Sequence, residues 1–238
     1  MVNLPNNLSP LPQIQLVVNP VAGLADAALE ITSQQAEALV VPVLVAQGLD
    51  VVVRCLDDPE LEKIVETKGQ IYPLTLAWNW GNAQVAELFE QCRQPRQIQK
   101  VVAEKGFLTG PGNYWLPVAL TEKGLLYGEL IGQGQDGHYL QPIHVEDKIR
   151  QPLYYLSQYL FKQLHVPLRG CCFLQVGWIQ GELCFDRLWP FPIQPALASL
   201  GVQSPDLFYA HYLCCQGLPL KDLRIKGQAP YGELADLS

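Results

Sequence analysis

The chain has 238 residues, of which 49% are hydrophobic and only 16% are charged, and its formal net charge is -7. This length suffices for one large domain or two small ones, each with a buried core. The negative charge and the lack of any run of Lys and Arg argue against a protein that binds nucleic acid through its phosphates.

Targeting features are also missing from the sequence. Residues 1–13 lack the basic segment and apolar core of a signal peptide, and we expect a flexible leader there. No apolar run reaches the roughly 20 residues that a membrane helix needs. The odd cysteine count of 7 is typical of reduced thiols, so we expect a cytoplasmic protein without a membrane span.

The first half of the chain alternates strand and helix patterns. We expect strands over residues 14–18, 49–56 and 71–78, and helices over 25–41, after Pro59 and after Asn82. Pro42 is expected to end the first helix, because a proline inside a helix removes a hydrogen bond. This order predicts an α/β half over residues 14–106.

The second half has a different pattern, which begins near Gly110-Pro111-Gly112. We expect strands over residues 114–121, 125–131, 139–145 and 171–188, the last interrupted by a turn, and helices over 148–165 and after Ser204. Ser204 is expected to be the N-cap of the last helix, with Pro205 at its first position. This half, residues 107–238, is predicted to be α+β, an antiparallel sheet with packed helices. The boundary is soft, and a single domain is equally compatible with the pattern.

Familiar chemical motifs are weak or absent. Gly132, Gly134 and Gly137 match the glycine pattern of dinucleotide-binding loops, but the following residues are extended rather than helical, which favours a plain loop. The four histidines and seven cysteines show no metal-ligand spacing. No serine or cysteine stands in a catalytic motif, so we predict neither a catalytic residue nor a metal site.

Aromatic residues in loops suggest contacts with a partner, because loop-borne Trp and Tyr often anchor interfaces. Burial as lids over the core is the other interpretation. The predicted partner-binding set also includes one arginine: Trp78, Trp80, Tyr114, Trp115, Trp189, Phe191 and Arg187.

One segment resembles a known family. Gly181-Glu182-Leu183, then Pro190 and Pro192, then Phe208, His211 and the closing Gly217-Leu218-Pro219-Leu220 follow a helix and a strand in a recognisable order. Residues 147–220 thereby resemble the C-terminal portion of ATP-grasp enzymes, most nearly carboxyaminoimidazole ribonucleotide synthetase. The resemblance implies an ATP-grasp-like fold and a site for Mg-ATP.

The segment departs from that family where the chemistry lies. The resemblance implies acidic and amide ligands for Mg²⁺ on two strands. Gln175 stands where a Glu would be expected, and Asp186-Arg187 replace Asn-Glu. Asp186 and Arg187 are neighbours on a strand, so we expect them on opposite faces and not paired with each other. Arg187 is expected to bond a carboxylate such as Glu182 or an acid of a partner.

These departures predict a degenerate, truncated ATP-grasp-like scaffold without catalysis. We expect a protein-binding factor with an assembly or regulatory role, without a cofactor, and of open oligomeric state. The alternative is a divergent ATP-dependent carboxylate–amine ligase or nucleotide-binding protein, with Asp186 and Gln175 holding Mg-ATP. A small-ligand pocket between the two halves is a third hypothesis.

Overall fold

The computed structural model describes residues 13–20, 29–67, 70–79, 81–134, 136–166, 169–227 and 232–233. The predicted leader, apart from Gln13, and the predicted contact residue Trp80 lie outside the described residues.

A small parallel sheet forms from the first half of the chain. Its strands run in the order β2-β1-β3, and they span Ile14–Val18 (β1), Val51–Cys55 (β2) and Gln70–Pro73 (β3). The helices among these strands are α1 (Ser33–Gln35), a π-helical turn (Ala36–Val40), α2 (Val41–Ala46) and α3 (Leu61–Glu66). The predicted strand–helix alternation is confirmed, although β3 ends at Pro73 rather than at Trp78.

The first helix differs from its prediction at both ends. Residues 29–32 are not helical, and the helix begins after Thr32, whose hydroxyl accepts a hydrogen bond from the Gln35 N–H at 3.2 Å. It also continues through Pro42 to Ala46. The preceding turn is π-helical, and its wider hydrogen-bond pattern accommodates a proline, which has no N–H to donate.

The second sheet has eight strands in the order β13-β8-β7-β5-β9-β10-β4, with β6 paired to β5. Its strands are β4 (Leu108–Thr109), β5 (Tyr114–Thr121), β6 (Gly124–Tyr127), β7 (Leu130–Gln133), β8 (Tyr139–His144), β9 (Gly170–Ile179), β10 (Glu182–Trp189) and β13 (Gly232–Glu233). A separate pair joins β11 (Gln203–Ser204) to β12 (Arg224–Ile225).

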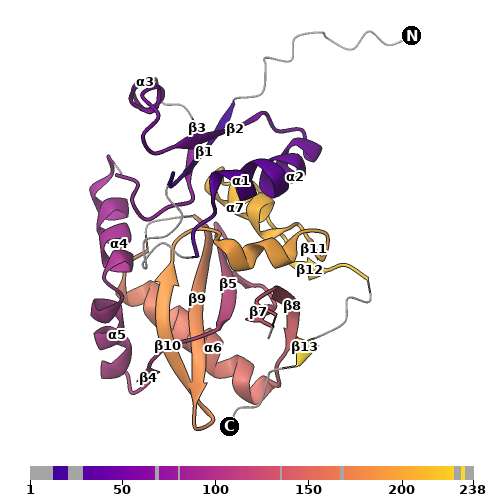
Figure 1. Ribbon diagram of the computed structural model, residues 1–238. Coiled ribbons are helices and arrows are strands. Elements are labelled where there is room, and N and C mark those ends of the chain that lie inside the picture. The colour runs from indigo at the N-terminus through magenta and orange to yellow at the C-terminus, as the bar shows by residue number, and fades with distance from the viewer. Residues whose placement is uncertain are drawn as a thin grey trace.

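Helices surround this sheet (Figure 1). They are α4 (Ala83–Arg93), α5 (Pro95–Glu104), α6 (Asp147–Gln163), the 3-10 helix η2 (Gln194–Ser199) and α7 (Leu207–Cys215). In Figure 1, α4 and α5 lie beside β10, α6 crosses behind the strands, and α7 lies between the two sheets. The predicted α/β class with an antiparallel second half is confirmed, whereas α5 has no counterpart among the predicted helices.

The strand expected over residues 125–131 is broken into β6 and β7. Both pair with β5, on either side of Pro117. Proline has no N–H to give to a neighbouring strand, so the ladder is interrupted opposite it, and the Pro117 carbonyl instead accepts from the Gly128 N–H at 2.9 Å.

Side chains from both sheets belong to one hydrophobic cluster. The helices α4 and α5, which precede the predicted boundary near residue 106, pack against β10 beyond it. The division into 14–106 and 107–238 stays a prediction. Within the described residues, no helix has both the length and the apolar character to cross a membrane.

Candidate functional site

The two strands singled out by the family resemblance, β9 and β10, hold the segment Gly110-Pro111-Gly112 against them. The Gln175 side chain donates from Nε2 to the Gly112 carbonyl at 2.7 Å, and its Oε1 accepts from the Trp189 Nε1–H at 3.0 Å. The Gly112 N–H in turn donates to Asp186 Oδ2 at 2.9 Å. We call Gln175, Asp186, Trp189 and Gly112 the strand clamp.

Glycine is required in this clamp because the backbones approach closely. A Cβ on Gly112 would lie 2.2 Å from the Val176 carbonyl oxygen, and one on Gly177 would lie 2.7 Å from the Pro111 carbonyl oxygen. Real side chains do not tolerate such distances, so both residues must be glycine for the segment to lie on the strands.

Asp186 and Arg187 do not behave as their strand alternation predicts. The register of β10 against β9 shifts between Phe185 and Arg187. Such a bulge places an extra residue in the strand and breaks the alternation of faces. Arg187 Nε therefore lies 3.9 Å from Asp186 Oδ1, and the expectation that the two residues do not pair is wrong.

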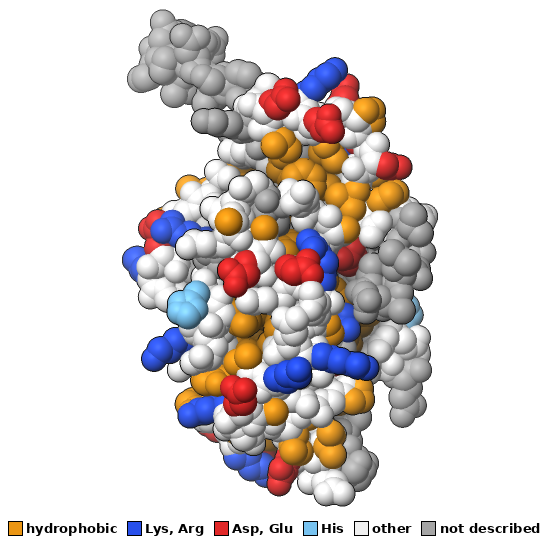
Figure 2. All heavy atoms as spheres, turned by 90° about the vertical axis from the view of Figure 1, so that its left-hand side faces the viewer, with side chains coloured by type: hydrophobic (Ala, Val, Ile, Leu, Met, Phe, Trp, Pro, Cys, Tyr) orange, Lys and Arg blue, Asp and Glu red, His pale blue; other side chains and the backbone are white. Residues whose placement is uncertain are grey.

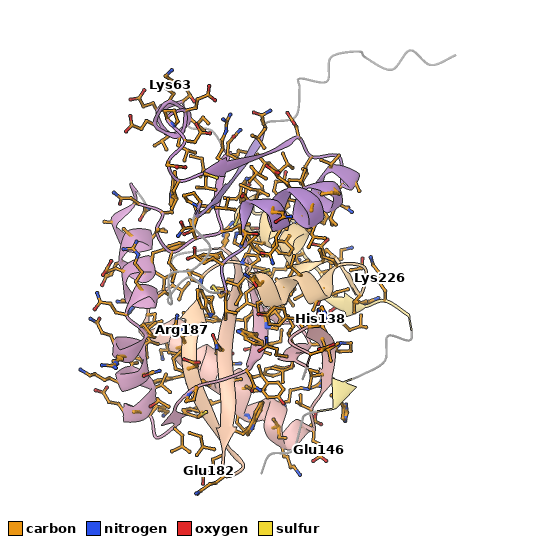
Figure 3. All side chains as sticks on the ribbon, in the orientation of Figure 1. Lys63, His138, Glu146, Glu182, Arg187 and Lys226 are labelled. Carbon is orange, nitrogen blue, oxygen red and sulfur yellow. The ribbon has the colours of Figure 1, made fainter. Side chains whose placement is uncertain are left out.

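The second expectation for Arg187, a bond to Glu182, fails as well. Figure 3 shows Glu182 at the tip of the β9–β10 hairpin and Arg187 far along β10 from it, toward α4. The guanidinium of Arg187 lies 5.2 Å from the centre of the Trp189 ring, a cation–π distance. Arg187 is thus held by Asp186 and Trp189 on its own strand.

The electrostatics of the strand clamp favour a structural role over metal binding. Burial raises the pKa of Asp186, while the Gly112 N–H and Arg187 act in the opposite direction. Both groups of the Gln175 amide are engaged by protein partners, and a guanidinium beside the carboxylate repels a cation. Among the described residues, no three His, Cys, Asp or Glu side chains gather where they could hold a metal ion. The residues present therefore do not fit Mg²⁺.

The predicted partner-binding aromatics differ in how deeply the fold buries them. Four of them are buried in the core, with exposed fractions of 7% or less: Tyr114, Trp115, Trp189 and Phe191. Their rings belong to the core, because β5, which carries Tyr114 and Trp115, is buried on both faces, and Trp189 and Phe191 lie at and just after the buried end of β10. Trp78 is half-buried on a loop, and its carbonyl accepts from Arg93 Nη2 at 3.4 Å. The structure does not bring the described members of this set together into one surface.

A second polar cluster lies where β9 begins. His211 on α7 accepts a hydrogen bond at Nδ1 from the Cys171 N–H at 2.9 Å, and its Nε2 lies 3.5 Å from the Cys215 sulfur. The thiol of Cys215 donates to the Arg169 carbonyl at 3.2 Å. Burial lowers the pKa of His211 to about 4, and desolvation by the surrounding protein raises the pKa of Cys215, although part of that residue is exposed. At neutral pH both groups are uncharged, so this is no thiolate–imidazolium pair.

Sequence reasoning found the scaffold of these clusters but missed several of their members. Gly112 appeared as a boundary marker, although the letters Gly-Pro-Gly do signal a tight backbone approach. Arg169 and Gln70 carried no signal, since they come from different halves, and only the fold brings both to the wall of one pocket between β3, the start of β9 and α7.

Comparison with known proteins supports the same fold. No protein-family model matches the chain, and no curated protein matches its sequence. Solved structures do match it. The carboxyaminoimidazole ribonucleotide synthase from Aspergillus clavatus, complexed with ATP, has a TM-score of 0.63 and 9% identity, covering 94% of this chain and 80% of its own.

Two further enzymes are similar in the same way. The N5-carboxyaminoimidazole ribonucleotide synthetase from Thermotoga maritima has a TM-score of 0.57 and 11% identity, over 90% of this chain and 78% of its own. The L-amino acid ligase from Bacillus licheniformis has a TM-score of 0.61 and 9% identity, over 90% of this chain and 76% of its own.

The fold is therefore that of ATP-grasp enzymes, and the resemblance seen in the sequence is confirmed. It also extends further than residues 147–220, because these alignments cover at least 90% of the chain. At such low identity the likeness defines the fold, and it assigns no activity to the chain.

Proposed function

We propose that this protein is a non-catalytic binding factor, built on an ATP-grasp-like fold, which acts in assembly or regulation by docking a protein partner. The alternative, an ATP-dependent ligase or nucleotide-binding protein, agrees with the fold alone. The strand clamp supports the first function, because it uses Gln175 and Asp186 to hold the protein's own backbone.

The observation that carries the docking proposal is an apolar stripe on the solvent side of the first helix. Leu39 is 43% exposed and Val45 is 50% exposed. Pro42 is exposed between them, and the run from Ala38 to Ala46 contains no charged residue. A helix that is apolar on every side is normally buried on every side, so this stripe calls for a covering surface.

Other features support the same interpretation. On the face that bears α4 and α5, acidic and basic side chains are interspersed with apolar ones, and neither sign forms a continuous patch (Figure 2). That surface suits a protein partner better than a phosphate backbone. All seven cysteines are free, which supports the cytoplasm as the proposed location.

Two variants test the docking surface. Leu39→Ser with Val45→Ser removes the apolar stripe, and the matched control Val65→Ser changes a side chain of similar exposure, 51%, on α3. We expect tagged wild-type protein and the control to retain the same specific partner from the native extract, and the double variant to lose it. Equal capture by all three, or a wild-type protein that remains monomeric and retains nothing specific, contradicts the proposal.

A titration with Mg-ATP tests the non-catalytic part. A ligand that binds the native state raises stability by about 2.7 kcal/mol at 100 times its Kd. We expect no shift in the unfolding temperature at millimolar Mg-ATP and no release of ADP. A shift in the wild type that Asp186→Asn abolishes would favour the ligase or nucleotide-binding alternative instead.

A further inference from the structure

A pocket of about 370 Å³ lies at the junction of the two sheets. Its walls come from β3, from Phe89 on α4, from the Arg169 end of β9, from Pro190-Phe191 and from α7. Pockets of this size, at a junction of structural units, are common places for small ligands. The pocket runs along β3, the edge strand of the parallel sheet, and is separate from the strand clamp.

The edge of β3 gives this pocket a wall with exposed backbone groups. The Leu74 N–H donates to the Val17 carbonyl on β1 at 2.8 Å. Because alternate residues of a parallel strand face opposite neighbours, Ile71 and Pro73 turn their backbone groups away from β1 and toward the outer edge. Pro73 has no N–H that would be left unpaired at this edge, and the edge of a sheet is where a strand tolerates proline.

The charge of the pocket is positive. Among the described residues that line it, Arg169 is the charged one, and none is an Asp or a Glu. His211 also lines the pocket, but burial lowers its pKa to about 4, so it is neutral at pH 7. Arg169 pairs with Glu122, whose side chain is 58% exposed, against 51% for the arginine. An exposed pair of this kind contributes at most about 1 kcal/mol, so an incoming anion can replace Glu122.

The remaining lining is mostly apolar and includes three aromatic rings, and one buried acceptor in it lacks a donor. The rings of Phe89 and Phe191 lie 5.8 Å apart and are tilted by 31°. Tyr72 lines the pocket beside them and accepts a hydrogen bond from the Gln216 amide. The Gln70 Oε1 atom is buried and has no hydrogen-bond donor among the described residues. A buried acceptor without a donor costs about 1–3 kcal/mol, and a turn of the partly exposed Gln70 side chain toward the pocket would let a ligand hydroxyl recover this energy.

We propose that this pocket binds a small aromatic carboxylate that carries a hydrogen-bond donor. Its carboxylate pairs with the Arg169 guanidinium, whose planar fork matches two carboxylate oxygens. Its ring lies against the apolar wall that Ile71, Pro73 and Pro190 form together with the rings of Phe89, Phe191 and Tyr72. Its hydroxyl or amino group donates to Gln70 Oε1 once that side chain has turned toward the pocket. The inference is independent of the proposed docking function, since the helical stripe and the pocket share no residue.

The experiment uses 4-hydroxybenzoate as the probe and the His211 ring as the reporter. His211 lies in the pocket wall, whereas the other three histidines do not line it. We expect saturable shifts of the His211 ring signals in NMR spectra as the probe is added to the full chain. Arg169→Gln should weaken the Kd at least tenfold, and the matched control Arg224→Gln, at an exposed arginine outside the pocket, should leave it unchanged.

Three comparisons make the result decisive. The neutral 4-hydroxybenzamide should bind the wild type as weakly as 4-hydroxybenzoate binds Arg169→Gln. Benzoate, which lacks the donor, should bind the wild type more weakly than 4-hydroxybenzoate does. In Gln70→Ala, benzoate and 4-hydroxybenzoate should bind with the same Kd. Inorganic phosphate should not saturate the shift at the same concentrations.

The proposal is overturned if His211 does not respond at 10 mM probe, if the amide binds as tightly as the acid, or if phosphate binds equally well. The last result would show a plain anion site. Mg-ATP added to the same sample separates the two proposals: stabilisation by Mg-ATP without a response of His211 contradicts the non-catalytic function and leaves the pocket assignment intact.

Discussion

Two polar regions lie along β9, and they use similar side chains in opposite ways. In the strand clamp, the amide of Gln175 and the carboxylate of Asp186 each have protein partners within 3 Å. At the start of the strand, Arg169 forms an exposed ion pair and Gln70 Oε1 is left without a donor. Polar groups that are fully satisfied internally contribute to structure, while groups without a partner beside a cavity can be satisfied by a ligand. From this contrast we expect the clamp to stabilise the fold and the pocket to bind the ligand proposed above.

The contrast is tested most severely at Gly112. In Gly112→Ala the new methyl group would lie 2.2 Å from the Val176 carbonyl oxygen, so the clamp segment must move off the strands. We expect a loss of about 4 kcal/mol in the free energy of unfolding, at the upper end for a single substitution. Urea denaturation measures it. Gly81→Ala is the control, because a Cβ there meets no atom within 4 Å, and it should change stability by less than about 1 kcal/mol. Similar losses for the two variants would show that the clamp is not tightly packed.

The pH dependence of stability tests the environment of His211 in the pocket. Its pKa falls from 6.5 to about 4 on folding because the ring is buried. The unfolded chain therefore binds the proton first as the pH falls, and stability decreases between pH 6.5 and pH 4. The difference of 2.5 pKa units corresponds to about 3 kcal/mol at 1.36 kcal/mol each.

Other groups titrate in the same range, so the measurement needs a matched variant. Burial raises the pKa values of Glu30, Asp186 and Asp206, which act in the opposite direction. In His211→Asn, the side-chain oxygen can still accept from the Cys171 N–H, but no imidazole titrates. The difference in stability between wild type and variant should shrink as the pH falls from 6.5 to 4. A constant difference would mean that His211 keeps its ordinary pKa.

Within the clamp, Gln175→Leu keeps the shape but removes both hydrogen bonds. The Trp189 Nε1–H and the Gly112 carbonyl would be left unpaired in a buried site, where each group costs about 1–3 kcal/mol. We expect a loss of at least about 2 kcal/mol. The test is a double-mutant cycle with Trp189→Phe, which removes the indole donor. If the two losses simply add, the Gln175–Trp189 bond contributes little.

The sequence predicts the scaffold of both regions better than their chemistry. Periodicity and turn residues identify β1, β5, α4 and α6 because those elements have regular apolar faces and clear caps. The bulge at Asp186 has no local signal, so strand alternation placed Asp186 and Arg187 on opposite faces, whereas they pair. The aromatics Trp115 and Trp189 seemed free for partners because exposure depends on which strands cover them. The pocket joins Gln70 to Arg169, 99 positions apart, and only tertiary contacts reveal such a pair.

The smallest test concerns the start of α7, the helix that brings His211 to the pocket. The sequence Ser204-Pro205-Asp206 suggested Ser204 as the N-cap, but Asp206 is the N-cap and accepts from the N–H groups of Phe208 and Tyr209, both at 3.0 Å. Ser204 instead belongs to the short strand β11 and is paired with Arg224 on β12. Asp206→Ala should cost about 1–2 kcal/mol, while Asp206→Asn, which can cap equally well, should cost less than about 0.5 kcal/mol. Ser204→Ala should be nearly neutral in the same urea titration.

Because α7 carries His211, Asp206→Ala should also broaden the His211 ring signals, whereas Ser204→Ala should not. The reverse ranking of the alanine variants would restore Ser204 as the cap and remove the link between this turn and the pocket.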